Sequence, residues 1–510
     1  MLSRRTRFFV AALGAIVGAG AISPSAPQFG VRRWPDWLAP CAIPELVAPV
    51  RCGTVRVVES GAWLGRTIPL RLVVVQASAS RPVSDPVLLL VGGPGQAATE
   101  LVTAYAPQIT ALRSDRDVIL IDQRGTGQET GLHCNPPASP ADLMGRIFEP
   151  GRLVECRDAL SQRADLTRYT TTNAASDYIK ILRALRYSQV NVWGTSYGTR
   201  LGLEMARTAP EMIRALVLDA VVPTSFTWPE AAAADLDAAL EVLIADCESD
   251  RPCADAFLRI RSEIDTAFAR LRGQRVMATI RDPATGAVAQ VPFSASDLAY
   301  AVRGLLYGND ARQLPWLFRL AAAGDYDAFA QAYVVRARSL DRQIARGVHL
   351  GVYCAEDLPF VNRSRASDAA MRTSIGTYLL DQYVAACEVW PRAAIDPRFR
   401  DAVSASVPTL LLSGRHDPVT PPRLATEVAR TLPNSRALVW QYGGHASDGL
   451  VSGSCRLQII RDFIAGANPA AVAVDCMTHV STIPFLLPRS PLDVLGDDRT
   501  PAPASWRSPR

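Results

Sequence analysis

Short continuous apolar runs alternate with helical patterns over the first half of the chain. The runs at residues 87–91 and 118–121 are apolar along their whole length, which is typical of strands buried on both faces. A helical pattern over residues 173–186 precedes another such run, and this alternation predicts a mostly parallel sheet. The strands predicted in this half cover residues 55–58, 68–75, 87–91, 118–122, 190–193 and 215–218.

The alternation stops between residues 223 and 400, where alanine- and leucine-rich helical stretches replace the strand pattern. It resumes with a strand at 409–413, a helix to about residue 432, a strand at 437–440 and a closing helix at 457–465. An α/β core interrupted by a helical insertion fits this pattern. The predicted parts are a core over 41–222 and 401–480, a helical cap over 223–400, and a Pro- and Arg-rich tail over 481–510 that is loosely ordered beyond Pro484.

Residues 190–200 combine the end of a strand, a Gly-x-Ser-x-Gly turn and the start of a helix with an apolar face. This combination is typical of a nucleophile elbow, in which a serine stands on a sharp turn between strand and helix. Gly194 and Gly198 flank the serine because side chains there would collide with the strand and helix backbones. Ser196 is therefore the candidate nucleophile.

A serine hydroxyl is a weak nucleophile at neutral pH and requires a base, which is in turn oriented by a carboxylate. His445 follows a predicted strand within a Gly-Gly-His loop, and Asp417 follows another predicted strand and precedes a proline. We predict these two as base and acid, because the order Ser, Asp, His is that of the α/β-hydrolase fold. His416 is the alternative base, and Asp219, after an earlier strand, is the alternative acid.

An oxyanion requires two N–H donors, one from the residue after the nucleophile and one from the loop after an earlier strand. Tyr197 and Gly93 are the candidates, and Gly93 belongs to a Gly-Gly-Pro-Gly segment that follows the strand at 87–91. These positions together predict an α/β-hydrolase fold, with the helical cap inserted before the acid-bearing strand. Such a site requires no metal ion and no organic cofactor.

Residues 1–30 predict an export signal. Arg4, Arg5 and Arg7 form a basic start, residues 8–22 an apolar run, and residues 19–21 a small-residue cleavage site. A secreted or extracytoplasmic protein is therefore expected, with an uncleaved N-terminal anchor as the alternative. No second apolar stretch is long enough to cross a membrane, so no stable span is expected after cleavage.

Ten cysteines in an exported chain indicate disulfides, and the sequence has no Cys-x-x-Cys spacing of the kind found in zinc or thioredoxin-like sites. Because short loops cost the least entropy to close, near neighbours are the expected partners. The predicted pairs are Cys41 with Cys52, Cys134 with Cys156, Cys247 with Cys253, Cys354 with Cys387, and Cys455 with Cys476.

The composition limits the class of protein further. With 510 residues, 48% of them hydrophobic, the chain can bury a large core. The net charge is only +5 and the body of the chain has no basic block, so no nucleic-acid partner is expected.

Five motifs in order resemble the prolyl aminopeptidase and secreted tripeptidyl aminopeptidase group of α/β-hydrolases. The resemblance covers about residues 41–476, includes a TAP-like C-terminal segment, and extends to cap segments 354–357 and 387–390. It implies an exopeptidase that releases an amino acid or a tripeptide from peptides with a free N-terminus. The motifs are Gly92-Gly93-Pro94-Gly95, Asp122-Gln123-Arg124-Gly125-Thr126-Gly127, Gly194-Thr195-Ser196-Tyr197-Gly198, Asp417-Pro418-Val419-Thr420-Pro421 and Gly444-His445-Ala446.

Selectivity for a free N-terminus requires carboxylates near the site to pair with the substrate ammonium group. Glu356 and Asp357 are the first candidates, and Glu230 and Glu388 are the second. Two alternatives remain open at this point. One is an exported carboxylesterase or lipase with the same triad, and the other is a catalytically silent binding protein of the same fold.

Overall fold

The computed structural model describes residues 34–44, 46–60, 65–145, 147–447, 453–481 and 483–488. The contacts divide the chain into two units, Met1–Pro35 and Asp36–Arg510, and the fold below is that of the second unit. The predicted export signal, residues 1–30, lies outside the described residues.

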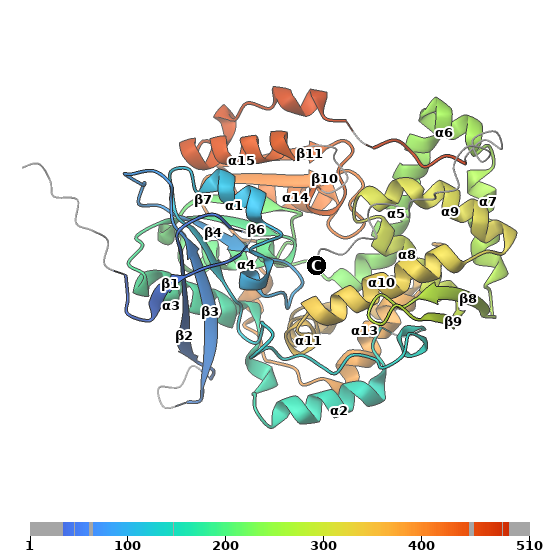
Figure 1. Cartoon of the computed structure of the whole chain (residues 1–510), viewed down its shortest axis with the longest axis horizontal. Coiled ribbons are helices and arrows are strands. Elements are labelled where there is room, and N and C mark those ends of the chain that lie inside the picture. Colours follow the sequence, from blue (N-terminus) through green and yellow to red (C-terminus); the bar gives the residue numbers. More distant parts are fainter. Residues whose placement is uncertain are drawn as a thin grey trace, which may run out of the picture. The chain divides into compact units, whose positions relative to one another are not determined.

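Within the described residues, nine strands form one mostly parallel sheet in the order β1-β2-β3-β5-β4-β6-β7-β10-β11 (Figure 1). The strands from β5 to β11 in this order are parallel, and β1, β2 and β3 add an antiparallel edge. The prediction of a mostly parallel sheet is confirmed, and β1 is an addition to it. The strands are β1 (Leu38–Cys41), β2 (Val50–Val58), β3 (Thr67–Val75), β4 (Val87–Leu90), β5 (Val118–Ile121), β6 (Val190–Thr195), β7 (Ile213–Asp219), β10 (Thr409–Gly414) and β11 (Ser435–Trp440).

Apolar residues on both faces of the central strands hold helices against the sheet. Successive side chains of a strand point to opposite faces. Val87 and Leu89 of β4 belong to the buried cluster that also contains residues of α1 (Ala106–Leu112) and α15 (Ser454–Gly466). Leu90 points to the other face, where it packs under Gly202 of the elbow helix. The helices of that face include α3 (Thr171–Ala184), α4 (Tyr197–Thr208) and α14 (Pro422–Ala429).

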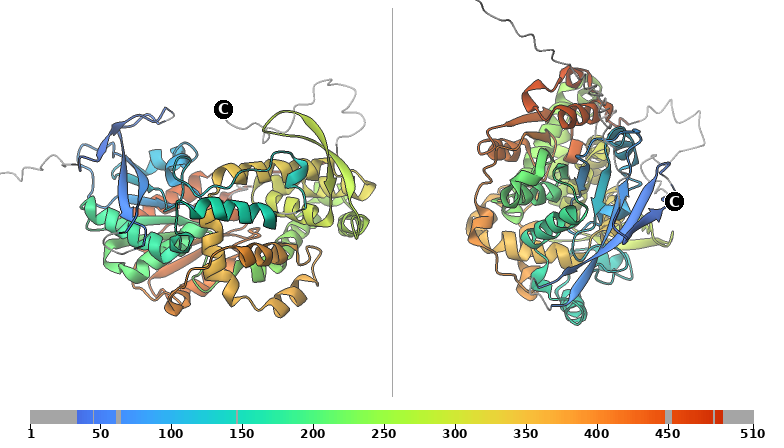
Figure 2. Two further views of the ribbon diagram at one scale, coloured as in Figure 1. Left: turned by 90° about the horizontal axis from the view of Figure 1, so that it is seen from below. Right: turned by 90° about the vertical axis from the view of Figure 1, so that its left-hand side faces the viewer.

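The chain between β7 and β10 is mostly helical, and α2 (Pro150–Ser161) packs against it from the core segment. A two-stranded antiparallel hairpin also forms here. The sequence pattern does not predict it, because its strands are half exposed and contain no continuous apolar run. Figure 2 shows this yellow-green hairpin and the blue strands β2 and β3 at opposite ends of the unit. The elements are α5 (Trp228–Ser249), α6 (Arg251–Ala256), α7 (Ile260–Arg270), β8 (Val276–Arg281), β9 (Val288–Phe293), α8 (Ala295–Leu305), α9 (Leu314–Ala323), α10 (Asp327–Gln343), α11 (Arg346–Val352), α12 (Arg363–Ala370) and α13 (Tyr378–Val389).

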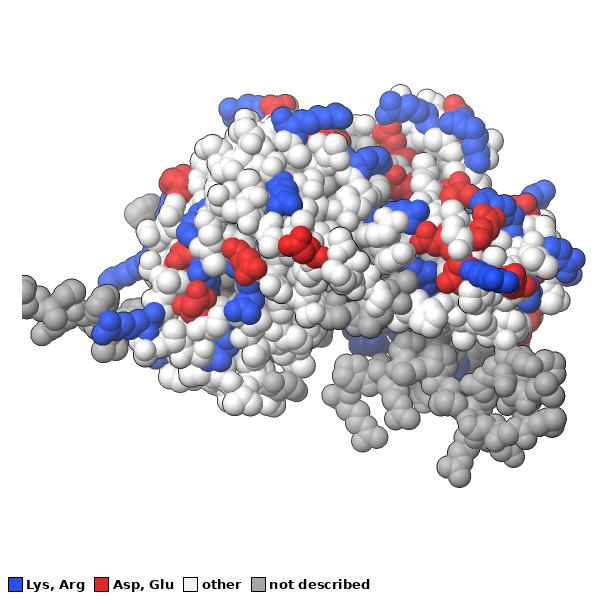
Figure 3. Space-filling view, turned by 90° about the horizontal axis from the view of Figure 1, so that it is seen from above, with Lys and Arg blue, Asp and Glu red and all other residues white. Residues whose placement is uncertain are grey.

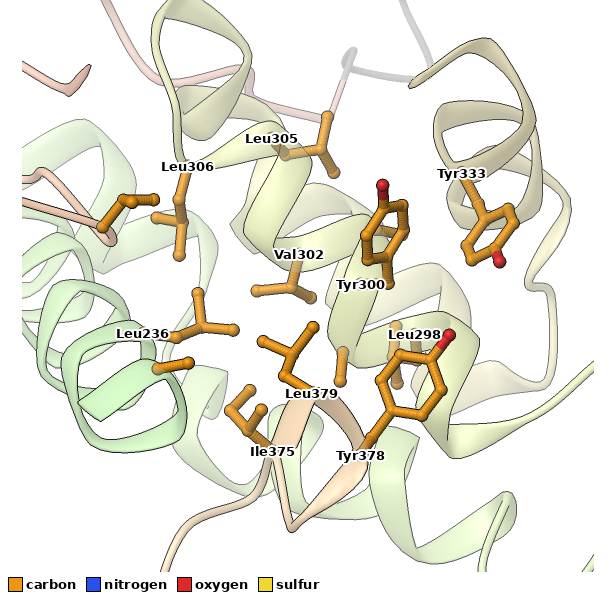
Figure 4. Packing of buried hydrophobic residues seen from close by; sticks show 14 of the residues in the cluster. Leu236, Leu298, Tyr300, Val302, Leu305, Leu306, Tyr333, Ile375, Tyr378 and Leu379 are labelled. Carbon is orange, nitrogen blue, oxygen red and sulfur yellow. The ribbon is translucent and has the colours of Figure 1, made fainter. Parts of the chain in front are cut away.

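The cap helices pack in a large hydrophobic cluster that also takes in residues of the core segments, and Figure 4 shows its part around α8. Val302 of α8 lies between Leu236 of α5 and Leu379 of α13, and all three side chains are buried. Burying one such aliphatic side chain contributes about 1.5–3 kcal/mol. The positions of the helices around the cleft are therefore fixed by packing within the cap.

Five disulfides join the cysteines in the predicted pairs, which confirms the pairing by near neighbours. Their Cα–Cα distances lie between 5.2 and 5.8 Å. Disulfides persist in oxidising compartments, so this complement fits a location outside the cytoplasm. The bonds are Cys41–Cys52, Cys134–Cys156, Cys247–Cys253, Cys354–Cys387 and Cys455–Cys476.

Among the helices of the described segments, none has the length and apolar character that a membrane span requires. Acidic and basic side chains are interspersed on the face shown in Figure 3. Of the predicted tail beyond Pro484, the structure describes residues up to 488, and Phe485 among them is buried against the guanidinium group of Arg312. The rest of the tail lies outside the described residues.

Candidate active site

Ser196 lies on a sharp turn between β6 and α4. Its φ of 56° and ψ of −126° are a strained combination for a residue other than glycine. A Cβ on Gly194 would lie 2.5 Å from the carbonyl oxygen of Gly198, and one on Gly198 would lie 2.2 Å from that of Leu90. The amide of Ser196 donates to the carbonyl oxygen of Asp219 at 2.9 Å, which fixes the turn against β7.

His445 and Asp417 form a buried pair beyond the carboxyl ends of β11 and β10. Nδ1 of His445 lies 2.9 Å from Oδ2 of Asp417, while Oδ1 accepts from the amides of Val419 and Thr420 at 2.8 and 2.9 Å. Burial raises the pKa of Asp417, but His445 and the hydrogen bonds from Thr420 outweigh it and hold that pKa below its usual value. An ionised carboxylate keeps a proton on Nδ1, so Nε2 carries the lone pair that accepts a proton.

The alternative base and acid bond to other residues. Nε2 of His416 lies 2.7 Å from the carboxylate of Asp246 in α5, which ties this turn to the cap. Asp219 is fully buried and pairs through Oδ2 with Arg456 of α15. The structure therefore brings Asp417, rather than Asp219, to His445.

The Gly-Gly-Pro-Gly segment lies directly beside Ser196, because a Cβ on Gly92 would lie 3.1 Å from the Cβ of Ser196. Gly93 has a φ of +114°, which side chains rarely adopt, and its bond to Pro94 is cis. Tyr197 begins α4, where the first N–H groups have no acceptor within the helix. The two segments that carry the predicted donors thus meet at Ser196.

Ser196 and His445 line one cavity of about 290 Å³ between the sheet and the cap. Gly92 and Gly93 line it from the core, and aromatic side chains line it from the cap. In the part of the chain that the structure describes, no aspartate or glutamate lines this cavity. The aromatic residues that the cap contributes include Trp228, Tyr300, Tyr307, Tyr353 and Tyr383.

His349 of α11 reaches the same cavity, and the sequence does not single it out because it does not follow a strand. Its Nδ1 lies 3.1 Å from the carbonyl oxygen of Pro94, and its Nε2 lies 2.8 Å from the hydroxyl of Tyr383. Burial, with the charge of Arg346, lowers the pKa of His349 to about 3, so the ring is neutral. Because a carbonyl only accepts, Nδ1–H donates to Pro94 and the Tyr383 hydroxyl donates to Nε2. The cap thus holds the Gly-Gly-Pro-Gly segment directly.

Glu356 and Asp357 do not occupy the position expected of them. They are 1% and 0% exposed, line no part of the cavity, and belong to a π-helical turn packed on the elbow helix. Asp357 accepts from Arg200 of that helix at 2.7 Å, and Glu356 accepts from the amide and hydroxyl of Thr171, both at 2.7 Å. Both carboxylates therefore have buried partners, and the structure does not place them in the cavity where a substrate ammonium group was expected to meet them.

This buried network also reaches the residue after the nucleophile. The hydroxyls of Thr171 and Tyr197 lie 2.8 Å apart, and Gln123 donates to the Tyr197 hydroxyl at 3.1 Å. Burial raises the pKa of Glu356 to about 7, against the opposing effects of Arg200 and Thr171. The Tyr197 side chain is therefore anchored beneath the elbow, and only its backbone is positioned for a role at the oxyanion.

The other two candidates for pairing with the substrate ammonium group, Glu230 and Glu388, also lie outside the cavity. Glu230 pairs with Arg365 at the surface of the cap, and Glu388 is exposed. Neither lines the cavity.

Two family models match the chain. One, described as the alpha/beta hydrolase fold, covers residues 85–252, and the other, described as TAP-like protein, covers residues 371–476. Together with the sheet order and the elbow, these matches show that the chain has the α/β-hydrolase fold. Residues 253–370 lie between the two matched segments and include His349 and most of the cap.

Several named proteins resemble this chain. Tripeptidyl aminopeptidase of Streptomyces coelicolor is 23% identical over 92% of this chain and 90% of its own length. Serine protease Hip1 of Mycobacterium tuberculosis is also 23% identical, over 68% of this chain and 72% of its own. Among solved structures, proline iminopeptidase of Mycobacterium smegmatis has a TM-score of 0.37 and 17% identity, over 82% of this chain and 100% of that one. The resemblance to the prolyl and tripeptidyl aminopeptidase group is confirmed, and the family models and the two sequence relatives support a hydrolase.

Proposed function

We propose that this chain is a serine peptidase that acts outside the cytoplasm and releases an amino acid or a tripeptide from the free N-terminus of peptides. The observation that carries the proposal is that Ser196 and His445 line one cavity beneath the cap, with Asp417 bonded to His445. The relatives named tripeptidyl aminopeptidase and serine protease support a peptide as the substrate. The five disulfides support the compartment.

In the proposed reaction, Ser196 Oγ attacks the scissile carbonyl while His445 Nε2 takes the hydroxyl proton. Asp417 orients the imidazole and stabilises its charged form. The N–H groups of Tyr197 and Gly93 donate to the carbonyl oxygen as it gains negative charge. His445 then gives its proton to the leaving amine, and the C–N bond breaks to leave an acyl-enzyme. Water, activated by the same imidazole, hydrolyses this ester and restores Ser196.

The test compares tripeptidyl and aminoacyl p-nitroanilides that carry a free amine with the same compounds N-acetylated. Cleavage of the free-amine compounds, with at least tenfold lower kcat/KM for the blocked ones, supports the proposal. Mass spectrometry of products from a peptide mixture then distinguishes release of amino acids from release of tripeptides. Equal cleavage of blocked and free compounds contradicts the exopeptidase assignment.

A carboxylesterase is the second candidate, and one observation favours it. The described part of the chain contributes no carboxylate to the cavity, so the wall holds no partner for an ammonium group. Ester and amide hydrolysis use the same acyl-enzyme route, and the triad does not separate them. Faster turnover of neutral p-nitrophenyl esters than of any free-amine anilide favours this candidate.

His349 is expected to act as a positioning residue for the Gly-Gly-Pro-Gly segment. His349→Ala removes the donor to the Pro94 carbonyl, and a displaced oxyanion donor is expected to lower kcat about 10- to 100-fold with little change in KM. His349→Asn retains an N–H near the position of Nδ1 and is expected to recover most of kcat. Steady-state kinetics of both variants check this, and two variants with wild-type kcat would remove the role.

A further inference from the structure

Three arginines line the cavity on its cap side, each from a different helix. Arg303 lies on α8, Arg336 on α10 and Arg346 on α11. With no aspartate or glutamate of the described residues in the lining, the charged side chains of this wall are all positive. The cleft is therefore cationic, although the chain as a whole is nearly neutral.

Two of these arginines lack an acidic partner. Arg346 bonds to Asp341 at 2.8 Å, whereas no carboxylate of the described chain lies within 4 Å of Arg303 or Arg336. The Nε atoms of Arg303 and Arg336 are buried and have no hydrogen-bond partner. Because these half-buried guanidinium groups have no carboxylate partner, an anion in the cavity would gain strong, charge-assisted hydrogen bonds there.

Three buried arginines of the fold, by contrast, pair with carboxylates. Arg124 forms a two-armed pair with Asp177, Arg200 bonds to Asp357, and Arg338 bonds to Asp282 at 3.0 Å. Arg303 and Arg336 differ from these three arginines in having no carboxylate partner.

Tyr307 lies between the candidate base and the two arginines that have no carboxylate partner. The guanidinium carbons of Arg303 and Arg336 lie 5.2 and 4.3 Å from the centre of the Tyr307 ring, and Arg303 also donates to its hydroxyl at 2.7 Å. The same ring lies 4.8 Å from the His445 ring, and its backbone carbonyl accepts from the His445 amide at 2.8 Å. One aromatic ring therefore separates the two cations from His445.

We propose that Arg303 and Arg336 form a carboxylate-binding subsite, so that preferred substrates carry a carboxylate close to the scissile bond. The inference rests on the proposed function in that substrate is cleaved within this cavity. The carboxylate comes from one of two sources: an acidic side chain on the residue whose carbonyl is attacked, or the free C-terminus of a one-residue leaving group.

The subsite also bears on the length of the released unit. Release of one amino acid places its ammonium group on the carbon next to the attacked carbonyl, close to both cations. Three extended residues span up to about 10 Å, so a tripeptide places the ammonium group away from them. Repulsion between like charges therefore favours release of the longer unit.

Two matched substrate pairs test the subsite. The first compares Ala-Ala-Glu with Ala-Ala-Gln p-nitroanilide, and the second compares the tetrapeptide Ala-Ala-Ala-Ala with its C-terminal amide. The wild-type enzyme is expected to prefer the charged member of one pair at least tenfold in kcat/KM, and the pair that responds identifies the source of the carboxylate. Arg336→Gln and Arg303→Gln are expected to bring that ratio close to one.

Arg342→Gln is the matched control, because Arg342 lies on α10 with an exposed side chain and does not line the cavity. It is expected to retain the wild-type ratio. Cleavage of all four substrates without preference for charge would overturn the subsite and leave the peptidase proposal intact.

If no peptide is cleaved and the peptidase proposal fails, a second measurement still tests whether the subsite binds a carboxylate. Glutarate and glutaramide are compared as protectants of the wild-type enzyme against a fluorophosphonate that labels Ser196. Stronger protection by glutarate, lost in Arg336→Gln, supports the subsite. Equal protection by the acid and the amide contradicts it.

Discussion

Ser196→Ala is expected to lower kcat/KM by about 10⁴-fold or more, since loss of a triad nucleophile leaves only binding and oxyanion stabilisation. The melting temperature is expected to change little, because the hydroxyl is not part of the bonds that hold the turn. The measurements are p-nitroanilide kinetics, calorimetry and labelling by a fluorophosphonate. A folded variant that still turns over substrate at an undiminished rate would remove Ser196 from the mechanism.

The acid provides a matched control for the same mechanism. Asp417→Asn is expected to cost about 10⁴-fold in kcat, because the amide no longer holds the imidazole in the required tautomer. Asp219→Asn alters the other buried acid near the elbow, whose oxygen bonds to Arg456, and is expected to affect stability far more than kcat. An equal loss of kcat in a folded Asp219→Asn protein would reverse the assignment of the acid.

The elbow is predictable from the sequence because its constraints are local and steric. Gly194 and Gly198 approach backbone atoms so closely that the turn excludes any side chain there. Asp417 and His445 are predictable for a related reason, since each lies in the loop after a strand and the carboxyl ends of parallel strands meet at one edge. The fold and the Asp417–His445 pair therefore follow from short motifs in a fixed order.

The walls of the cavity are not predictable in this way. Whether Glu356 faces the cleft or the elbow depends on a π-helical turn and on Arg200 of a helix far away in sequence. Arg303 and Arg336 meet only because α8 packs on α10, where Gly304 contacts the Arg336 side chain. No spacing along the chain encodes such a meeting, so the residues that select the substrate become visible only in three dimensions.

Loss of the Arg200 side chain is expected to destabilise the folded protein strongly. Arg200 joins the elbow helix to the cap, donating to Asp357 at 2.7 Å and to the Phe226 carbonyl at 2.6 Å, with Glu356 at 3.8 Å. Arg200→Met leaves two fully buried carboxylates without their cation. Breaking a buried pair from one side typically costs about 3–5 kcal/mol in the free energy of unfolding. Urea unfolding at pH 8, with the disulfides intact, measures this loss.

The loss in Arg200→Met is expected to be smaller at pH 5 than at pH 8. Burial already raises the pKa of Glu356 to about 7, well above its unfolded value, and removal of Arg200 raises that pKa further. The folded state then binds protons that the unfolded state releases, so stability is retained at low pH and falls as pH rises through the folded-state pKa. Arg261→Gln, which removes an exposed pair with Glu248, is the control and is expected to cost at most about 1 kcal/mol at either pH. Equal losses in Arg200→Met and Arg261→Gln would show that the elbow and the cap do not depend on this ion pair.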